Sequence, residues 1–233
     1  MSSVIFQNME THGFVATDTL AVNEHGNPGL FRSKAFYIPH LKTITYATGW
    51  GDVLEDWFIH INRRMVVAGI EHLDCFATET LQSIWEEFNE RNKAHLQKHL
   101  CKTVTVYHMG VSEVTGKIVV YAYRSKEGFA SEKLKPGIGV KPECTVPDGP
   151  ADLMEMMKEQ RHIQQNSGIP FNQQVHIGGE IQVYQLDAEA GECRISTHAR
   201  FDDYEQMFKQ MCGKIRMDHY LEEWEQSLGD KPY

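Results

Sequence analysis

Three residues near the start of the chain are of types that could act together in nucleophilic catalysis. Ser2 becomes the first residue once Met1 is removed, and an N-terminal Ser holds a nucleophilic hydroxyl together with a base, its own α-amine. That amine titrates at about 7.7–8.0 in model compounds, close to neutral pH. Asp18 and Lys34 follow at successive intervals of sixteen residues. A Lys34 cation would favour the alkoxide and lower the pKa of the amine, and Asp18 would keep the lysine charged and oriented.

A glycine turn could supply the remaining part of such a site. Gly49 lies in the small-residue stretch Ala47-Thr48-Gly49-Trp50-Gly51, directly before a predicted helix. Backbone N–H groups at a helix start are free to stabilise an oxyanion. Each residue also has an ordinary explanation: many cytosolic proteins begin Met-Ser, Asp18 and Lys34 could be surface charges, and the turn could simply precede a capped helix.

The elements that must position these residues begin with strands. Alternating or β-branched patterns predict strands over residues 4–8, 13–22, 35–38 and 41–47, with a turn-rich loop at 23–29. Apolar residues at helical spacing then predict helices over 52–67 and 78–99. Asp52 and Thr78 are suitable N-caps for the two helices.

The pattern then returns to strands, predicted over 103–109 and 117–123, followed by a Gly- and Pro-rich connection at 126–149 with room for one short strand. A third helix is predicted over 152–165, and a strand pair over 175–186 and 193–198. Polar amphipathic helices over 201–212 and 217–227 end the chain. Strand groups flanked by helix pairs favour an α+β fold of two sheets packed face to face with helices outside.

The segment from Ser2 to Asp52 resembles the start of a proteasome β-type subunit, an N-terminal-nucleophile (Ntn) hydrolase. The resemblance rests on the N-terminal hydroxyl residue, on Asp18 in Ala16-Thr17-Asp18, on Lys34 before the strand at 35–38, and on the turn Gly49-Trp50-Gly51-Asp52. It implies that Ser2 is the nucleophile, that Asp18 and Lys34 activate it, and that the Gly49 N–H is the oxyanion donor. It also implies a four-layer αββα sandwich over residues 1–200, with a helical extension over 201–233.

Other positions depart from the family's pattern. Family members usually begin with Thr. Ile138, in Gly137-Ile138-Gly139, falls where a Ser in a Gly-Ser-Gly turn is expected, and Gln174 and Ile177 fall where a supporting Asp and Ser are expected. Leu20 replaces an Arg. These changes remove polar groups that orient the terminal amine. His176 falls near the same place and could substitute for a missing partner, although a histidine at a strand end is the simpler interpretation.

The resemblance also implies a primary substrate pocket. Its lining would be Ala21, Arg32, Tyr46, Trp50 and Leu54. An Arg beside two aromatic residues would make a narrow pocket with a positive wall, suited to small or acidic groups.

Composition excludes several function classes. The net charge of −9 and the pI near 5.7 argue against a nucleic-acid partner. No run reaches the roughly 20 apolar residues of a membrane span, and the N-terminus lacks the pattern of a signal peptide. The five cysteines form no CxxC pair, which is typical of reduced cytosolic thiols. A cytoplasmic protein is therefore expected.

No cofactor or metal is predicted. His95 and His99 have a spacing that can chelate on a helix, but neither a carboxylate nor a cysteine completes a set there, so a solvated helix face is the better interpretation. The leading function is a peptidase or amide hydrolase that self-associates into a ring, a property of the family; a feeding ATPase is left open. Two alternatives remain: an inactive ring or scaffold subunit, and a small-molecule amidohydrolase on the same sandwich.

Overall fold

A computed structural model describes residues 3–23, 25–93, 103–148 and 152–214. The chain folds as an α+β protein whose strands form three sheets. Ser2, the histidines His95 and His99 and the predicted helix at 217–227 lie outside the described residues, and their predictions stay predictions.

The first sheet contains the chain's opening hairpin. Its strands lie in the order β10-β1-β2-β11-β12 and all neighbours are antiparallel. The bounds are β1 Val4–Asn8, β2 His12–Asp18, β10 Gly137–Lys141, β11 Glu180–Asp187 and β12 Glu192–Arg200. Residues far apart in sequence therefore lie on either side of β1 and β2.

The second sheet is a meander in sequence order, β5-β6-β7-β8-β9. Its strands are β5 Ala35–Ile38, β6 Thr43–Thr48, β7 Thr105–Val111, β8 Ile118–Arg124 and β9 Ser131–Leu134. A separate hairpin, β3 Leu20–Val22 with β4 Pro28–Phe31, connects the two large sheets. Every residue of β6 is buried, because this strand has protein packed on both faces.

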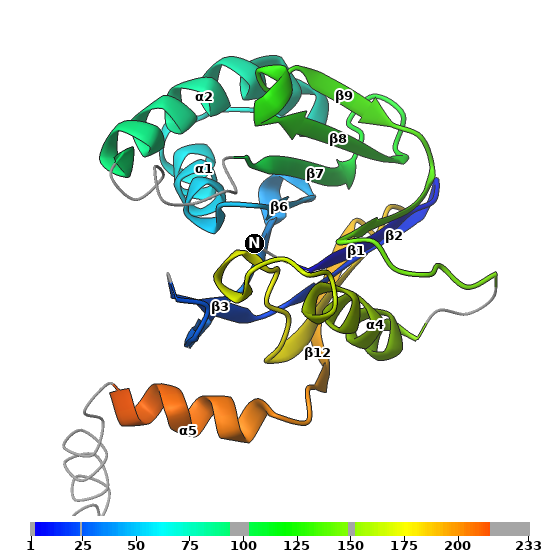
Figure 1. The fold of residues 1–233 in the computed structure, drawn as a ribbon. Helices are drawn as coiled ribbons and strands as arrows, with labels where there is room; N and C mark the ends of the chain where they lie inside the picture. The colour runs from blue at the N-terminus through cyan, green and yellow to red at the C-terminus, as the bar shows by residue number, and fades with distance from the viewer. Residues whose placement is uncertain (1–2, 24, 94–102, 149–151, 215–233) are drawn as a thin grey trace, which may run out of the picture.

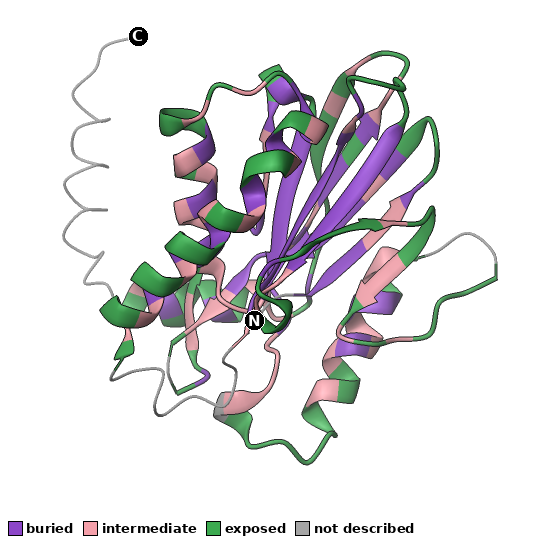
Figure 2. Cartoon of the chain, turned by 90° about the horizontal axis from the view of Figure 1, so that it is seen from above, coloured by how far each residue is buried: buried purple, intermediate pink, exposed green. Residues whose placement is uncertain are grey.

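Two helices cover the outer face of the second sheet, as Figure 1 shows. They are α1 Gly51–Arg64 and α2 Ile70–Arg91. Their buried residues recur at helical spacing, for example Val53, Trp57 and Ile61 on α1, and they join Val106 of the sheet in one apolar core. Figure 2 shows these inward faces buried and the outward faces exposed.

The two large sheets pack against each other through a second core, which includes Val4 and Val15 from one sheet and Ile44 and Tyr46 from the other. On the far face of the first sheet, α4 Leu153–Gln165 contributes Met156 and Met157 to a third core. The last described helix, α5 Tyr204–Lys214, projects beyond β12 in Figure 1. Short 3-10 turns complete the described chain at Pro39–Leu41, Ser125–Glu127 and Phe171–Gln173.

Several sequence predictions need correction. Asp52 is not the N-cap of the first helix, because α1 begins at Gly51, with Trp50 at the cap position and no side-chain cap. The second helix begins at Ile70, eight residues before the predicted start, since Glu113 from the β7–β8 turn accepts hydrogen bonds from the backbone of Glu71 and His72. The connection at 126–149 contains two strands, β9 and β10. Ile138 is therefore an exposed residue of edge strand β10, opposite Gln7, and does not lie in a turn.

No described helix is long and apolar enough to cross a membrane. The predicted boundaries of the first strand and of the strand at 35–38 are the observed ones. The predicted helix at 201–212 corresponds to α5.

Candidate functional site

A buried ion pair joins Asp18 and Lys34. Asp18 ends β2 and Lys34 directly precedes β5, so the β3–β4 hairpin lies between them in sequence. Lys34 Nζ donates to Asp18 Oδ1 at 2.7 Å, and the two side chains are 6% and 0% exposed. Burial of two charges is tolerated because each has an opposite partner. The structure thus brings together two of the predicted catalytic residues.

The Asp18 carboxylate also accepts two backbone hydrogen bonds. Oδ1 accepts from the Ser3 amide at 3.0 Å, and Oδ2 accepts from the Gly178 amide at 3.1 Å. Ser3 directly precedes β1, and Gly178 lies just before β11, so the two sheet neighbours of β2 both contribute. With three donors on two oxygens, the carboxylate is held in one orientation beside the start of the chain.

Burial lowers the pKa of Lys34 below its usual value. The charge of Asp18 and its hydrogen bond oppose this shift, and the nearby Arg32 cation adds to it. A lysine with a lowered pKa releases and accepts a proton more readily at neutral pH than an exposed one does.

Ser3 is held by its side chain as well as by its backbone. Its hydroxyl donates to Gln160 Oε1 of α4 at 2.5 Å, and Gln160 Nε2 donates to the Pro142 carbonyl at 2.5 Å. Both Ser3 and Gln160 are fully buried. The residue that follows the predicted nucleophile is therefore fixed to β2 and to α4.

Gly49 lies at the same end of the second sheet as Lys34. Ala35 pairs with Tyr46 in the β5–β6 register, so the residues before Ala35 run alongside those that lead to Gly49. The φ angle of Gly49 is +100°, and a Cβ there would lie 2.2 Å from the Thr103 carbonyl oxygen. Only glycine fits this turn, which ends β6 and leads into α1.

The five predicted pocket residues do not share one surface. Tyr46 is fully buried between the two sheets, where its ring stacks on Tyr107 at 5.0 Å, and Leu54 is buried beneath α1. Neither side chain offers a ligand any surface. Ala21 and Trp50 are partly exposed, and Trp50 packs at 5.4 Å from Phe88.

Arg32 does not form a free positive wall. Its Nη1 lies 3.2 Å from an Asp52 oxygen and 3.5 Å from a Glu55 oxygen, at the first turn of α1. These two carboxylates offset the charge that was expected to attract acidic groups. Among the predicted pocket residues, Ala21, Arg32 and Trp50 remain candidates for substrate contact.

The residues before β11 supply backbone atoms and little side-chain polarity. Ile177 is buried in the core beneath α4, and Gln174 donates to the Ile169 carbonyl at 2.8 Å. His176 contacts the Phe171 carbonyl at 2.8 Å. Burial lowers its pKa, the hydrogen bond with the Phe171 carbonyl opposes this shift, and cations that include Arg161 and Lys34 add to it, so the neutral imidazole is favoured.

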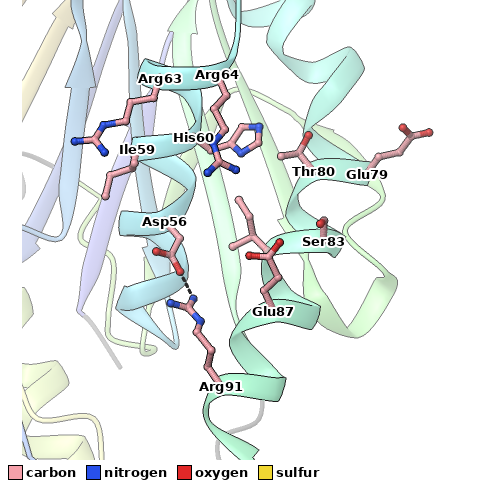
Figure 3. A pocket seen from close by; sticks show the side chains of 11 residues that line it. Asp56, Ile59, His60, Arg63, Arg64, Glu79, Thr80, Ser83, Glu87 and Arg91 are labelled. Carbon is pink, nitrogen blue, oxygen red and sulfur yellow. Dashed lines mark hydrogen bonds and ion pairs between the residues drawn. The ribbon is translucent and has the colours of Figure 1, made fainter.

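A concavity of about 480 Å³ lies on the outer surface between α1 and α2 (Figure 3). His60, Arg63 and Arg64 come from α1, whereas Glu79 and Glu87 come from α2. Figure 3 shows Arg91 paired with Asp56 across the groove. The charges are mixed and partly paired, so the groove has no single sign that would select a charged small molecule.

A second concavity, of about 560 Å³, lies at the opposite end of β2 from Asp18 and is bordered by His12, Asp187 and Cys193. Within the described ranges, no group of three His, Cys, Asp or Glu side chains converges to hold a metal ion. The four cysteines in these ranges are free thiols: Cys75, Cys144, Cys193 and Cys212.

Sequence reasoning missed Ser3, Gln160 and the Gly178 amide. A signal for Gln160 was present, because it is a polar residue on the face of α4 that buries Met156 and Met157. No sequence pattern marks the Gly178 amide, since a backbone donor carries no residue type.

Comparison with known proteins places this geometry on a known fold. No family model and no curated protein matches the chain. Among solved structures, Anbu (ancestral beta-subunit) from Yersinia bercovieri has a TM-score of 0.55 at 11% identity, covering 99% of this chain and 98% of that one. A Gly-1 mutant of Anbu from Hyphomicrobium sp. strain MC1 has a TM-score of 0.57 at 10% identity, covering 100% and 99% of the two chains.

The chain shares the fold of these Anbu proteins. The likeness extends over essentially the whole of both chains, and a further Anbu structure from Hyphomicrobium sp. strain MC1 agrees, with a TM-score of 0.54. At 10–11% identity the likeness concerns the fold and not the chemistry.

Proposed function

We propose that this protein is a proteasome-like Ntn amide hydrolase whose nucleophile is Ser2, exposed by removal of Met1. The observation that carries the proposal is the buried Asp18–Lys34 pair, whose carboxylate also binds the Ser3 amide at 3.0 Å. That amide nitrogen is bonded to the carbonyl carbon of Ser2, so the ion pair is separated from Ser2 by one peptide bond. In the proposed arrangement the Lys34 cation lies beside the Ser2 hydroxyl and favours its alkoxide, while the α-amine of Ser2 is the base.

The reaction follows from these groups. The Ser2 hydroxyl oxygen adds to the amide carbon while its proton passes to the α-amine, and the Lys34 cation stabilises the developing charge. The tetrahedral intermediate then collapses, the C–N bond breaks, and the leaving amine takes the proton. Water attacks the resulting ester by the same proton relay and regenerates Ser2. The Gly49 N–H is the proposed oxyanion donor, and peptides are the proposed substrate class.

The proposal includes the family's architecture and assembly. The packing of α1 and α2 on one sheet and α4 on the other fits a four-layer αββα sandwich, with α5 beginning a C-terminal extension from residue 201. Self-association into a ring is proposed with it, since the related fold is that of a proteasome-like subunit. Native mass spectrometry would measure the subunit number directly.

A second candidate function is a non-catalytic ring or scaffold subunit. It is favoured by Ile177 and Gln174, because one is buried in the core and the other binds a loop carbonyl, so neither side chain supports the terminal amine. In this case the ion pair would only stabilise the fold.

Intact mass and covalent labelling separate the two functions. We expect the purified protein to lack Met1, to carry a free Ser2 amine, and to gain the mass of a β-lactone on Ser2. The Ser2→Ala variant should gain none, whereas a variant of the exposed Lys117 should label like the wild type. Retained Met1, an acetylated Ser2 or the absence of an adduct in the wild type would favour the scaffold.

A further inference from the structure

Gln160 is a polar side chain in an apolar setting. It lies on the inner face of α4, one turn after Met156 and Met157, and is fully buried. Burying a primary amide without partners costs free energy, so such a residue is retained where its hydrogen bonds are made.

Both ends of the Gln160 amide have partners. The oxygen accepts from the Ser3 hydroxyl, and the nitrogen donates to the Pro142 carbonyl in the connection between β10 and α4. The second bond fixes the amide plane and therefore the direction in which the oxygen points at Ser3. The side chain connects three segments: the chain start, the β10–α4 connection and α4.

Ser3 consequently has two anchors at different angles. Its amide donates to Asp18 and its hydroxyl donates to Gln160. One hydrogen bond fixes a point but allows rotation about it. Two bonds from one residue to different elements also fix its orientation, and with it the direction in which the preceding residue leaves.

We propose that Gln160 is a positioning residue for the nucleophile, which holds Ser3 so that Ser2 is presented to Lys34. The inference rests on the proposed function of Ser2. A nucleophile at a chain end lacks the second flanking peptide that restrains other catalytic residues. A displacement of about 1 Å can reduce a rate about 100-fold, so such an anchor has a measurable consequence.

The test compares β-lactone labelling of Ser2 in wild type, Gln160→Met and Ser3→Ala, with Gln165→Met as the matched control. Met has nearly the shape of Gln but neither hydrogen bond, and Gln165 is an exposed residue of the same helix. We expect the maximal labelling rate of the first two variants to fall roughly 10- to 100-fold, with the inhibitor affinity within about twofold. The control should match the wild type.

The pH dependence of the labelling rate is a second measurement. Its midpoint reports the pKa of the terminal amine, and a loss of stability alone does not change that midpoint. In the proposed arrangement the Lys34 cation would lower the pKa of the terminal amine below that of a free one, so the wild-type labelling rate should rise at a correspondingly lower pH. In Gln160→Met the midpoint should move up toward the free α-amine range of about 7.7–8.0. Ser3→Ala removes only a hydroxyl and should show the same upward shift of the pH midpoint. This variant keeps the test decisive if Gln160→Met folds poorly.

Each outcome decides the question. Wild-type labelling kinetics and an unchanged pH midpoint in both variants would overturn the role of Gln160 and leave the proposed function intact. An equal rate loss in Gln165→Met would assign the effect to α4 in general. A wild type that gains no adduct on Ser2 would overturn the proposed function, and the positioning role with it.

Discussion

Asp18 and Lys34 hold opposite charges where water is excluded, and this decides how each can be altered. Asp18 keeps two backbone donors when the lysine is removed, whereas Asp18 is the one anionic partner of Lys34 among the residues that the structure describes. A carboxylate left without its counter-charge in such a site is costly. The pair is therefore both a structural element and the proposed activating group.

Replacing Lys34 with Met should lower the free energy of unfolding by about 3–5 kcal/mol, because a buried carboxylate loses its partner. Adding Asp18→Asn should restore part of that loss by removing the charge. Urea denaturation of the single and double variants measures both effects. Lys117→Met, which breaks the exposed pair with Glu10, should cost at most about 1 kcal/mol. A similar loss of stability in Lys34→Met and Lys117→Met would contradict the prediction.

His108 is the residue that should make the fold sensitive to acid. Burial lowers its pKa to about 3, and its Nε2 accepts from Trp57 Nε1 at 2.7 Å. The unfolded chain binds a proton near pH 6.5 and the folded chain does not, so this contribution is complete above pH 6.5 and is lost as pH falls toward 3. The loss should amount to a few kcal/mol.

Unfolding free energies measured from pH 8 to pH 4 test this assignment. The unfolding free energy of the His108→Gln variant should decline less steeply with falling pH than that of the wild type. The difference in slope should correspond to nearly one bound proton. Parallel declines in wild type and His108→Gln would assign the acid sensitivity to other groups.

At the residue scale, sequence reasoning found the ion pair but missed its surroundings. The spacing of Asp18 and Lys34 was visible because both are charged residues at strand ends. The anchors of Ser3 were not visible, because Gln160 comes from a helix more than 150 residues away and meets Ser3 only when α4 packs on the first sheet. Contacts of that range depend on tertiary packing, which the local pattern does not encode.

At the scale of elements, α2 is capped by another part of the molecule. Its first turn has no side-chain cap of its own, and the Glu113 carboxylate accepts from the backbone of Glu71 and His72 instead. A negative group at a helix N-terminus satisfies free N–H groups and interacts favourably with the helix dipole. The β7–β8 turn thus determines where α2 starts.

Replacing Glu113 with Ala should destabilise the protein by about 0.5–2 kcal/mol, the usual effect of losing an N-cap. Hydrogen exchange should rise selectively in the first turn of α2. Glu10→Ala in the β1–β2 turn serves as the control, since its carboxylate contacts an exposed lysine and caps no helix. Uniform exchange across α2 in both variants would argue against the cap.

The same capping explains the largest error in the sequence prediction. Strands such as Val4–Asn8 and Ala35–Ile38 were placed correctly because their apolar pattern alone identifies them. Residues 70–77 have helical periodicity, with Ile70, Leu73 and Ala77 buried, but Thr78 was the stronger local cap. At most one short strand was expected in 126–149, because a Gly-, Pro- and Lys-rich segment such as β10 becomes a strand only by pairing with β1, where Phe6 packs over Gly139.

At the scale of the whole molecule, α5 is held against the body by a small apolar core and by one ion pair. Met207 and Met211 pack with Leu20, while Arg161 of α4 binds Asp203 through two hydrogen bonds. Phe208 remains 45% exposed on the other side of the helix. Tyr204, the first residue of α5, also stacks on Phe31 of β4 at 4.7 Å and lies under the Arg200 guanidinium.

Replacing Arg161 with Met should loosen α5 without unfolding the body. The pair is partly exposed, so global stability should fall by no more than about 1 kcal/mol. Hydrogen exchange in residues 204–214 should rise while β6 and β7 stay protected. Lys158→Met, which removes the exposed pair with Glu155 on the same helix α4, is the matched control. Unchanged exchange in Arg161→Met would show that the apolar core alone holds the helix.

Gln160 and Arg161 are consecutive residues of α4, and they contact opposite ends of the chain. The first binds Ser3 and the second binds Asp203, so a single peptide bond separates the anchor of the N-terminal strand from that of the C-terminal helix. A force applied to α5 therefore acts on the same turn of α4 that holds Ser3. β1 and α5, the first and last elements that the structure describes, are mechanically connected through two adjacent residues of α4.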